Sequence, residues 1–169
     1  MNNNQRQEQF LKLYEPVHKQ FERFCRARVY GRMEYSDLMN ETLILAFEKF
    51  GSLRSMDAFL SFLCGISIRI LANANRKKQE EQGFETTILQ VRDYSADTER
   101  DTEINLLYEA LSHLSSDQSE SLILFEIIGF SIREIAEMHK VSESAVKQRL
   151  KRGRERLTEL LTYESSLKN

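Results

Sequence analysis

Residues 129–156 read GFSIREIAEMHKVSESAVKQRLKRGRER and hold two helix-start signals a short distance apart. Ser131 is placed to cap a first helix, with Glu134 three residues later to complete a capping box. Ser142 is placed to cap a second helix. The sequence between the two caps has room for only one short helix and a tight turn around 139–141, in which no glycine occurs. This spacing predicts a helix-turn-helix.

The second predicted helix has one apolar or small stripe and is basic elsewhere. Val146, Leu150 and Gly153 repeat at four- and three-residue steps, which predicts a face turned toward a core. In a helix-turn-helix the start of the second helix meets base edges, whereas cations further along meet phosphates. A basic helix can also be a solvated amphipathic helix without a ligand, but the paired caps favour DNA. We therefore predict that Ser144, Lys147 and Gln148 reach the groove, and that Arg149, Lys151, Arg152 and Arg154 contact mainly the backbone.

Composition indicates an ordinary globular chain. It has 169 residues, of which 41% are hydrophobic and 30% charged, with one proline and six glycines. The scarcity of helix breakers and of alternating β-branched residues favours an all-α fold. No uninterrupted apolar run reaches the length of a membrane span, and the first residues lack the apolar core of a signal peptide. We expect a cytoplasmic protein without membrane insertion.

The net charge of −2 conceals a strong segregation of charge along the chain. Residues 1–78 contain 13 Lys and Arg against 8 Asp and Glu, and residues 127–169 contain 9 against 6. Residues 79–126 between them contain 2 against 12. The polar stretch 79–101 has only scattered apolar residues and is predicted to be a flexible acidic linker. It would join two small helical domains, at 1–78 and 102–169.

Two polar surfaces are predicted in the N-terminal bundle. A helix beginning near Tyr35 and ending at Gly51 places Asp37, Asn40 and Glu41 on one polar face. Asp37 and Glu41 can also act only within the protein, by stabilising the start of this helix through its dipole. A longer helix, predicted over 55–78, is apolar at first and basic at its end. Its last turns present residues that lie within reach of a polyanion: Arg69, Asn73, Arg76, Lys77 and Lys78.

Metal, cofactor and enzyme functions have little support in the sequence. The two cysteines, Cys25 and Cys64, stand far apart, and the three histidines are not spaced as ligand pairs. We find no phosphate-binding glycine loop and no nucleophile with its base. We expect no metal, no cofactor and no catalytic residue.

Taken in order, these features resemble a bacterial RNA polymerase sigma factor of the small, extracytoplasmic-function type. The resemblance rests on the bundle with Asp37-Leu-Met-Asn-Glu-Thr-Leu, the long helix ending Arg76-Lys-Lys, the acidic linker, and the helix-turn-helix with Glu134-Ile-Ala and Val146-Lys-Gln-Arg-Leu. It covers roughly residues 10–161. It implies that core RNA polymerase and promoter DNA are the partners, and that an anti-sigma protein regulates the chain.

The resemblance also implies a role for each set of residues. By this resemblance, the residues that dock on the polymerase are Asp37, Leu38, Asn40 and Glu41. Those that contact the minus-ten element are Arg69, Asn73, Arg76 and Lys77. The minus-thirty-five contact falls to Ser142, Ser144, Lys147, Gln148, Arg149, Lys151, Arg152 and Arg154. The chain departs from the family pattern in the N-terminal part: Arg69 stands where Asn is usual, Asn73 where Asp is usual, Phe62 where Trp is usual and Asn40 where Gln is usual.

Two other functions fit the same sequence. The first is a stand-alone helix-turn-helix regulator whose N-terminal bundle dimerises, and which binds an inverted repeat with half-sites about one helical turn apart. The second is a sigma-like decoy that binds a regulatory protein but no longer starts transcription, which the residues at Arg69 and Asn73 would allow.

Overall fold

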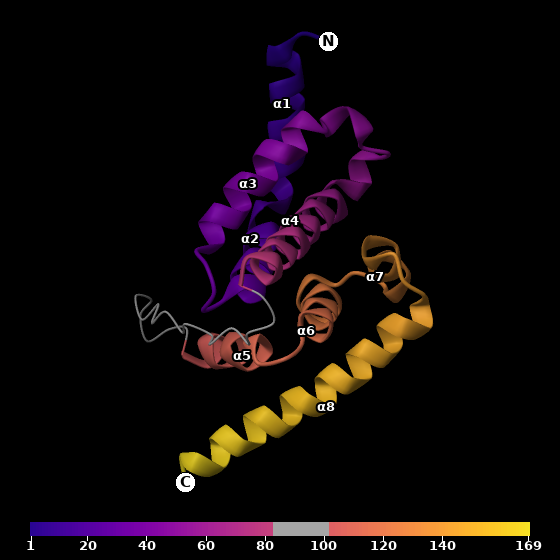
Figure 1. Cartoon of the computed structure of the whole chain (residues 1–169). Helices are drawn as coiled ribbons and strands as arrows, with labels where there is room; N and C mark the ends of the chain where they lie inside the picture. The colour runs from indigo at the N-terminus through magenta and orange to yellow at the C-terminus, as the bar shows by residue number, and fades with distance from the viewer. Residues whose placement is uncertain (83–101) are drawn as a thin grey trace. The chain divides into compact units, whose positions relative to one another are not determined.

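Every regular element in the described part of the chain is helical (Figure 1). The computed structural model describes residues 1–82 and 102–169, and the all-α prediction is confirmed over these ranges. The described residues form two compact units. Unit 1 contains residues 1–22 and 35–82, and unit 2 contains residues 23–34 and 102–169. The sequence assigned 23–34 to the N-terminal body, whereas its contacts group it with the C-terminal residues.

The N-terminal residues form two helices that are separated at the only proline of the sequence. α1 (Asn3–Tyr14) is followed by a 3₁₀ turn, η1 (Glu15–Val17), and then by α2 (His18–Val29), whose second half belongs to unit 2. Pro16 has no N–H to donate, and its ring collides with the carbonyl four residues earlier in a regular helix. The chain therefore tightens into a 3₁₀ turn at this point.

The core of unit 1 is a cluster of phenylalanines. The ring of Phe10 in α1 packs edge-on against those of Phe47, Phe50 and Phe59, with centroids 5.3–5.5 Å apart. Arg6 donates hydrogen bonds to the carbonyls of Phe47 and Glu48, at 2.6 and 3.0 Å. These contacts join α1 to the end of α3 (Tyr35–Glu48) and to the segment after it, which contains η2 (Phe50–Ser52) and η3 (Met56–Ala58).

The helix α4 (Phe59–Gln82) completes unit 1 by packing along α3. A buried hydrogen bond of 2.8 Å joins Thr42 of α3 to Ser67 of α4. The segment Met56–Glu81 has the length and apolar content of a membrane-crossing helix, but so does a core helix, and its residues Phe59 to Ser67 are largely buried in unit 1. α4 continues past the predicted linker start at residue 79. The predicted linker residues 83–101 lie outside the described part.

Unit 2 contains the predicted helix-turn-helix. α5 (Thr102–Ser112) is followed by α6 (Ser116–Leu122), which continues into a π-helical segment, η5 (Ile123–Ile128). α7 (Ile132–His139) and the long α8 (Glu143–Leu167) follow. α8 packs against α5, α6 and α7, so it is the helix around which the C-terminal part of unit 2 is built (Figure 1).

Gly153 allows α6 and α8 to approach closely. A methyl group built at this position would lie 2.9 Å from Cδ1 and 3.3 Å from Cγ of the buried Leu122, and 3.4 Å from Cβ of Gln118. The glycine is therefore required by packing, despite its low helix propensity.

We expect Gly153→Val to lower the free energy of unfolding of unit 2 by about 1–3 kcal/mol, because the larger side chain forces the two helices apart. Denaturant titration followed by far-ultraviolet circular dichroism measures the change. Gly51→Val is the matched control, since nothing lies within 4 Å of the corresponding position there. Equal losses for the two variants would contradict the packing role.

Candidate nucleic-acid interface

The two helix starts predicted in the helix-turn-helix form as expected. The Ser131 hydroxyl accepts a hydrogen bond from the Glu134 N–H at 3.1 Å, while the Glu134 carboxylate accepts one from the Ser131 N–H at 2.8 Å. The Ser142 hydroxyl accepts from the Ala145 N–H at 3.1 Å. Both caps satisfy amide groups that have no partner within the helix. The starting points of α7 and α8 are therefore determined locally.

The turn between these helices uses a lysine where a glycine is common. Lys140 has φ +56° and ψ +45°, and it is the only non-glycine residue with positive φ in the described ranges. This left-handed conformation ends α7, and the Lys140 and Val141 N–H groups donate to the last carbonyls of that helix. The sequence contains no glycine here to indicate the turn, and the structure forms it without one.

α8 presents a buried stripe and an exposed polar face. Val146, Leu150 and Gly153 are buried, as their spacing predicted. Five exposed side chains in the first half of α8 occur at steps of three and four residues and so share one side of the helix. They are Ser144, Lys147, Gln148, Lys151 and Arg152, which we call the α8 face; the exposed Glu155 continues the same side one turn later. Within the described ranges, none of the three cations of this face has an acidic partner, so their charge is directed to solvent.

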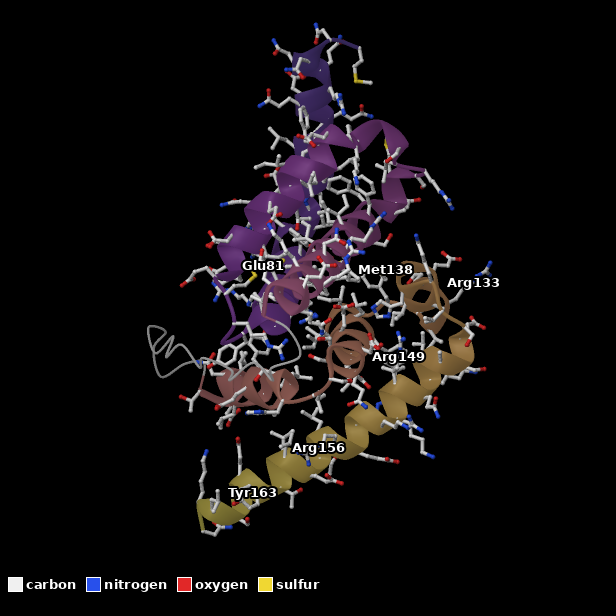
Figure 2. The ribbon with its side chains drawn as sticks, viewed as in Figure 1. Glu81, Arg133, Met138, Arg149, Arg156 and Tyr163 are labelled. Atoms are coloured by element: carbon white, nitrogen blue, oxygen red, sulfur yellow. The ribbon has the colours of Figure 1, made fainter. Side chains whose placement is uncertain are left out.

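The other two α8 side chains predicted to contact DNA, Arg149 and Arg154, interact with other residues of the protein. Arg149 is 23% exposed; its guanidinium lies 3.6 Å from the Asp117 carboxylate and 3.5 Å from Nδ1 of His139, on the side of α8 toward α6 (Figure 2). Arg154 donates two hydrogen bonds to Glu126, at 2.6 and 3.0 Å, and lies over the Phe125 ring. Arg149 and Arg154 therefore differ from the three cations of the α8 face, which have no acidic partner in the described ranges.

A cluster of buried ionisable side chains joins α2, α6 and α7. Oε2 of Glu120 accepts a hydrogen bond from Arg28 at 2.7 Å, and its Oε1 lies 2.8 Å from Nε2 of His139. All three side chains are less than a tenth exposed. Burial would raise the pKa of the Glu120 carboxyl, but the hydrogen bond from His139 and the charge and hydrogen bond of Arg28 outweigh it and hold that pKa below its usual value. Glu120 is therefore ionised. Sequence reasoning did not identify this cluster.

The second half of α4 carries the second predicted set of residues, before the last turn at 79–82, which contains no basic residue. Arg69, Asn73, Arg76 and Lys77 are all exposed, and their spacing of four, three and one residues keeps them on neighbouring parts of the helix surface. Arg69 donates to the Gly65 carbonyl at 3.3 Å, and Arg76 donates to the Asn73 side chain at 3.4 Å. The structure thus brings the four predicted residues together on the exposed part of one helix of unit 1.

The predicted docking surface on α3 requires one correction and one addition. Asp37, Asn40 and Glu41 are exposed on the same side of α3, as the helical spacing predicted. Leu38 is completely buried, so it belongs to the core and is not available to a partner. Ile44 is 62% exposed, seven residues after Asp37 and three after Glu41, so it extends this surface by one turn. Helical spacing counted from Asp37 would have identified it.

No metal site is formed by residues 1–82 and 102–169: these ranges contain no group of three or more His, Cys, Asp and Glu side chains placed to hold an ion. Cys25 and Cys64 are buried and carry free thiols. Three exposed polar surfaces are described above: the α8 face, the basic segment 69–78 of α4 and the acidic side of α3.

Comparison with known proteins gives consistent matches. Residues 104–157 match the family described as Sigma-70, region 4. The ECF RNA polymerase sigma factor SigM of Mycobacterium tuberculosis is 28% identical over 155 residues, which cover 91% of this chain and 78% of SigM. The ECF RNA polymerase sigma factor SigX of Bacillus subtilis is 26% identical over 159 residues, which cover 87% of this chain and 80% of SigX.

Solved structures agree with these sequence matches. The sigma factor RpoE from Bartonella quintana, in complex with the anti-sigma factor NepR, superposes with a TM-score of 0.79 at 25% identity, covering 92% of this chain and 98% of RpoE. CnrH, in complex with the cytosolic domain of CnrY, has the same fold with a TM-score of 0.64 at 19% identity. The matches in sequence, in fold and in region 4 are all to sigma factors, and both relatives matched in sequence are of the extracytoplasmic-function type.

Proposed function

We propose that this protein binds core RNA polymerase and directs it to promoters through two DNA-contacting surfaces. In this proposal the α8 face reads the minus-thirty-five element, and the basic segment 69–78 of α4 contacts the minus-ten element. The single observation that carries the DNA assignment is the α8 face. It exposes three unpaired cations beside Ser144 and Gln148, at the start of the second helix of a helix-turn-helix.

The proposed polymerase contact is the acidic side of α3. Asp37 and Glu41 are exposed carboxylates one helical turn apart, with Asn40 between them and the exposed Ile44 beyond. An acidic surface with one apolar side chain is suited to a basic partner with an apolar groove. Asp37 also stabilises the first turn of α3 through the helix dipole, which does not exclude its contact with a partner.

Regulation by an anti-sigma protein is part of the same proposal. RpoE was solved with an anti-sigma factor bound, and CnrH with the cytosolic domain of CnrY. Their similarity to this chain supports a regulator of this kind. A protein that acts with RNA polymerase works in the cytoplasm. Its role is binding rather than catalysis.

The DNA assignment predicts different effects for different residues of the α8 face. Lys147→Ala with Gln148→Ala should weaken promoter binding by the polymerase complex and relax its sequence preference, because side chains at the start of the helix meet base edges. Arg152→Ala should weaken binding to all sequences and lower the slope of log affinity against log salt by about one, because a phosphate contact is lost.

Filter binding at several salt concentrations measures both effects. Lys168→Ala is the matched control, since it removes an exposed cation after the end of α8. An unchanged slope for Arg152→Ala relative to the wild-type protein and this control would contradict the phosphate contact. An unchanged sequence preference in the double variant would contradict the groove contact.

A further inference from the structure

Both ring nitrogens of His139 make hydrogen-bond contacts, one with a carboxylate and the other with a guanidinium. Its Nε2 lies 2.8 Å from the Glu120 carboxylate, and its Nδ1 lies 3.5 Å from Nη1 of Arg149. An ionised carboxylate only accepts hydrogen bonds, so Nε2 must carry the proton that it shares with Glu120. In a neutral ring Nδ1 is then the unprotonated nitrogen, and it accepts from Arg149.

This arrangement holds one cation of α8 away from the α8 face. Arg149 follows Gln148 directly, yet its side chain lies against α6 and α7, between His139 and Asp117. The charged groups that surround the imidazole come from three elements. Glu120 and Asp117 belong to α6, Arg149 to α8, and Arg28 of α2 lies on the far side of Glu120.

We propose that His139 is a positioning residue whose protonation state decides whether Arg149 joins the α8 face. A neutral His139 accepts the hydrogen bond from Arg149 and keeps it beside Asp117. A protonated His139 carries an N–H at Nδ1 and no longer accepts. Two cations then face each other about 3.5 Å apart at a partly buried site, where their repulsion is stronger than in water.

The consequence for Arg149 follows from its position. Glu120 keeps its bond to Nε2 in both states, because that nitrogen is a donor throughout. Arg149 is therefore the group that moves, and the adjacent exposed surface is the α8 face. The DNA part of this inference rests on the proposed function: one more cation on this face adds one phosphate contact.

The first test examines the protein without DNA. Nitrogen-15 resonances of the His139 ring in the full chain, recorded near pH 8, should identify Nε2 as the protonated nitrogen. Protonation of His139 on acidification should shift the Arg149 guanidinium resonances toward those of a solvated arginine. His139→Gln is the matched variant, because its amide can still donate to Glu120 but does not titrate. Protonation of Nδ1 in the neutral ring, or the same Arg149 shift in His139→Gln, would overturn the proposal.

The second test uses binding of the full chain to a short DNA duplex of arbitrary sequence, since phosphate contacts do not depend on sequence. The wild-type salt slope should become steeper by about 0.9 between pH 8 and pH 5, the amount expected for one phosphate. His139→Gln and Arg149→Gln should show no such change, although both retain His18 and His113. An equal change in all three proteins would overturn the role of His139. Failure of the wild-type protein to bind DNA at any pH would overturn the added phosphate contact but not the proposed function, which is tested with the polymerase complex; the resonance test would still decide the positioning role.

Discussion

Glu120→Ala should lower the free energy of unfolding of unit 2 by about 3–5 kcal/mol. The carboxylate is the shared partner of Arg28 and His139, and all three side chains are buried. Its removal leaves the Arg28 charge without a partner in a site that water does not reach. Denaturant titration followed by circular dichroism, together with hydrogen exchange of the α6 and α7 amides, measures the loss.

The structure provides a matched control for this variant. Glu126 pairs with Arg154 at 2.6 Å, but both side chains are about half exposed. Glu126→Ala should therefore cost no more than about 1 kcal/mol, as exposed ion pairs contribute little. Similar losses for the two variants would show that the Glu120 cluster is not the buried ion pair described here.

The Glu120 cluster also determines how stability should depend on acidity. The pKa of Glu120 is lower in the folded protein than its usual value, because His139 and Arg28 outweigh the effect of burial. The folded state therefore favours the ionised carboxylate. This contribution to stability is complete above the pKa of the unfolded chain and is lost as the pH falls through the lower, folded value. Glu120→Gln should remove this part of the acid dependence; an acid profile identical to that of the wild-type protein would contradict it.

Glu41→Lys should reduce the affinity for core RNA polymerase by about 100-fold or more, because it places a cation where the proposed surface is acidic. Glu41 is exposed on α3, so the substitution should leave the folding of unit 1 unchanged. Asp37→Lys should have a similar effect on binding, with an additional stability cost of up to about 1 kcal/mol from the helix dipole. Pull-down of purified core polymerase measures the binding, and circular dichroism measures the fold.

The control for this prediction is Glu8→Lys, which reverses an exposed charge on α1 of the same unit. It should leave polymerase binding unchanged. Ile44→Ser should weaken binding without any change of charge, since it removes the exposed apolar side chain of the surface. Full binding by Glu41→Lys would exclude this side of α3 as the docking surface.

The sequence predicted those parts of the site that depend on neighbouring residues. The caps at Ser131 and Ser142 and the buried stripe through Val146 and Leu150 follow from interactions over three or four residues, and all of them form. Pro16 separates α1 from α2, although the apolar residues on both sides of it keep helical spacing. Periodicity records which side of a helix is apolar, but not whether the helix continues.

Other features depend on residues that are distant along the chain. Arg28 and Glu120 are 92 positions apart, and no local pattern connects them. The spacing on α8 placed Arg149 and Arg154 among the DNA contacts, but it could not reveal that Asp117, His139 and Glu126 bind them. Leu38 was included because it matches a family motif, although its burial places it in the core.

Transcription in vitro, with purified core polymerase and genomic DNA fragments, tests the central claim most directly. We predict that the wild-type chain gives discrete transcripts that core polymerase alone does not produce. We also predict that Lys147→Ala with Gln148→Ala loses these transcripts while still binding the polymerase. A folded wild-type chain that binds DNA but yields no transcript with core polymerase would contradict the account and favour a stand-alone regulator.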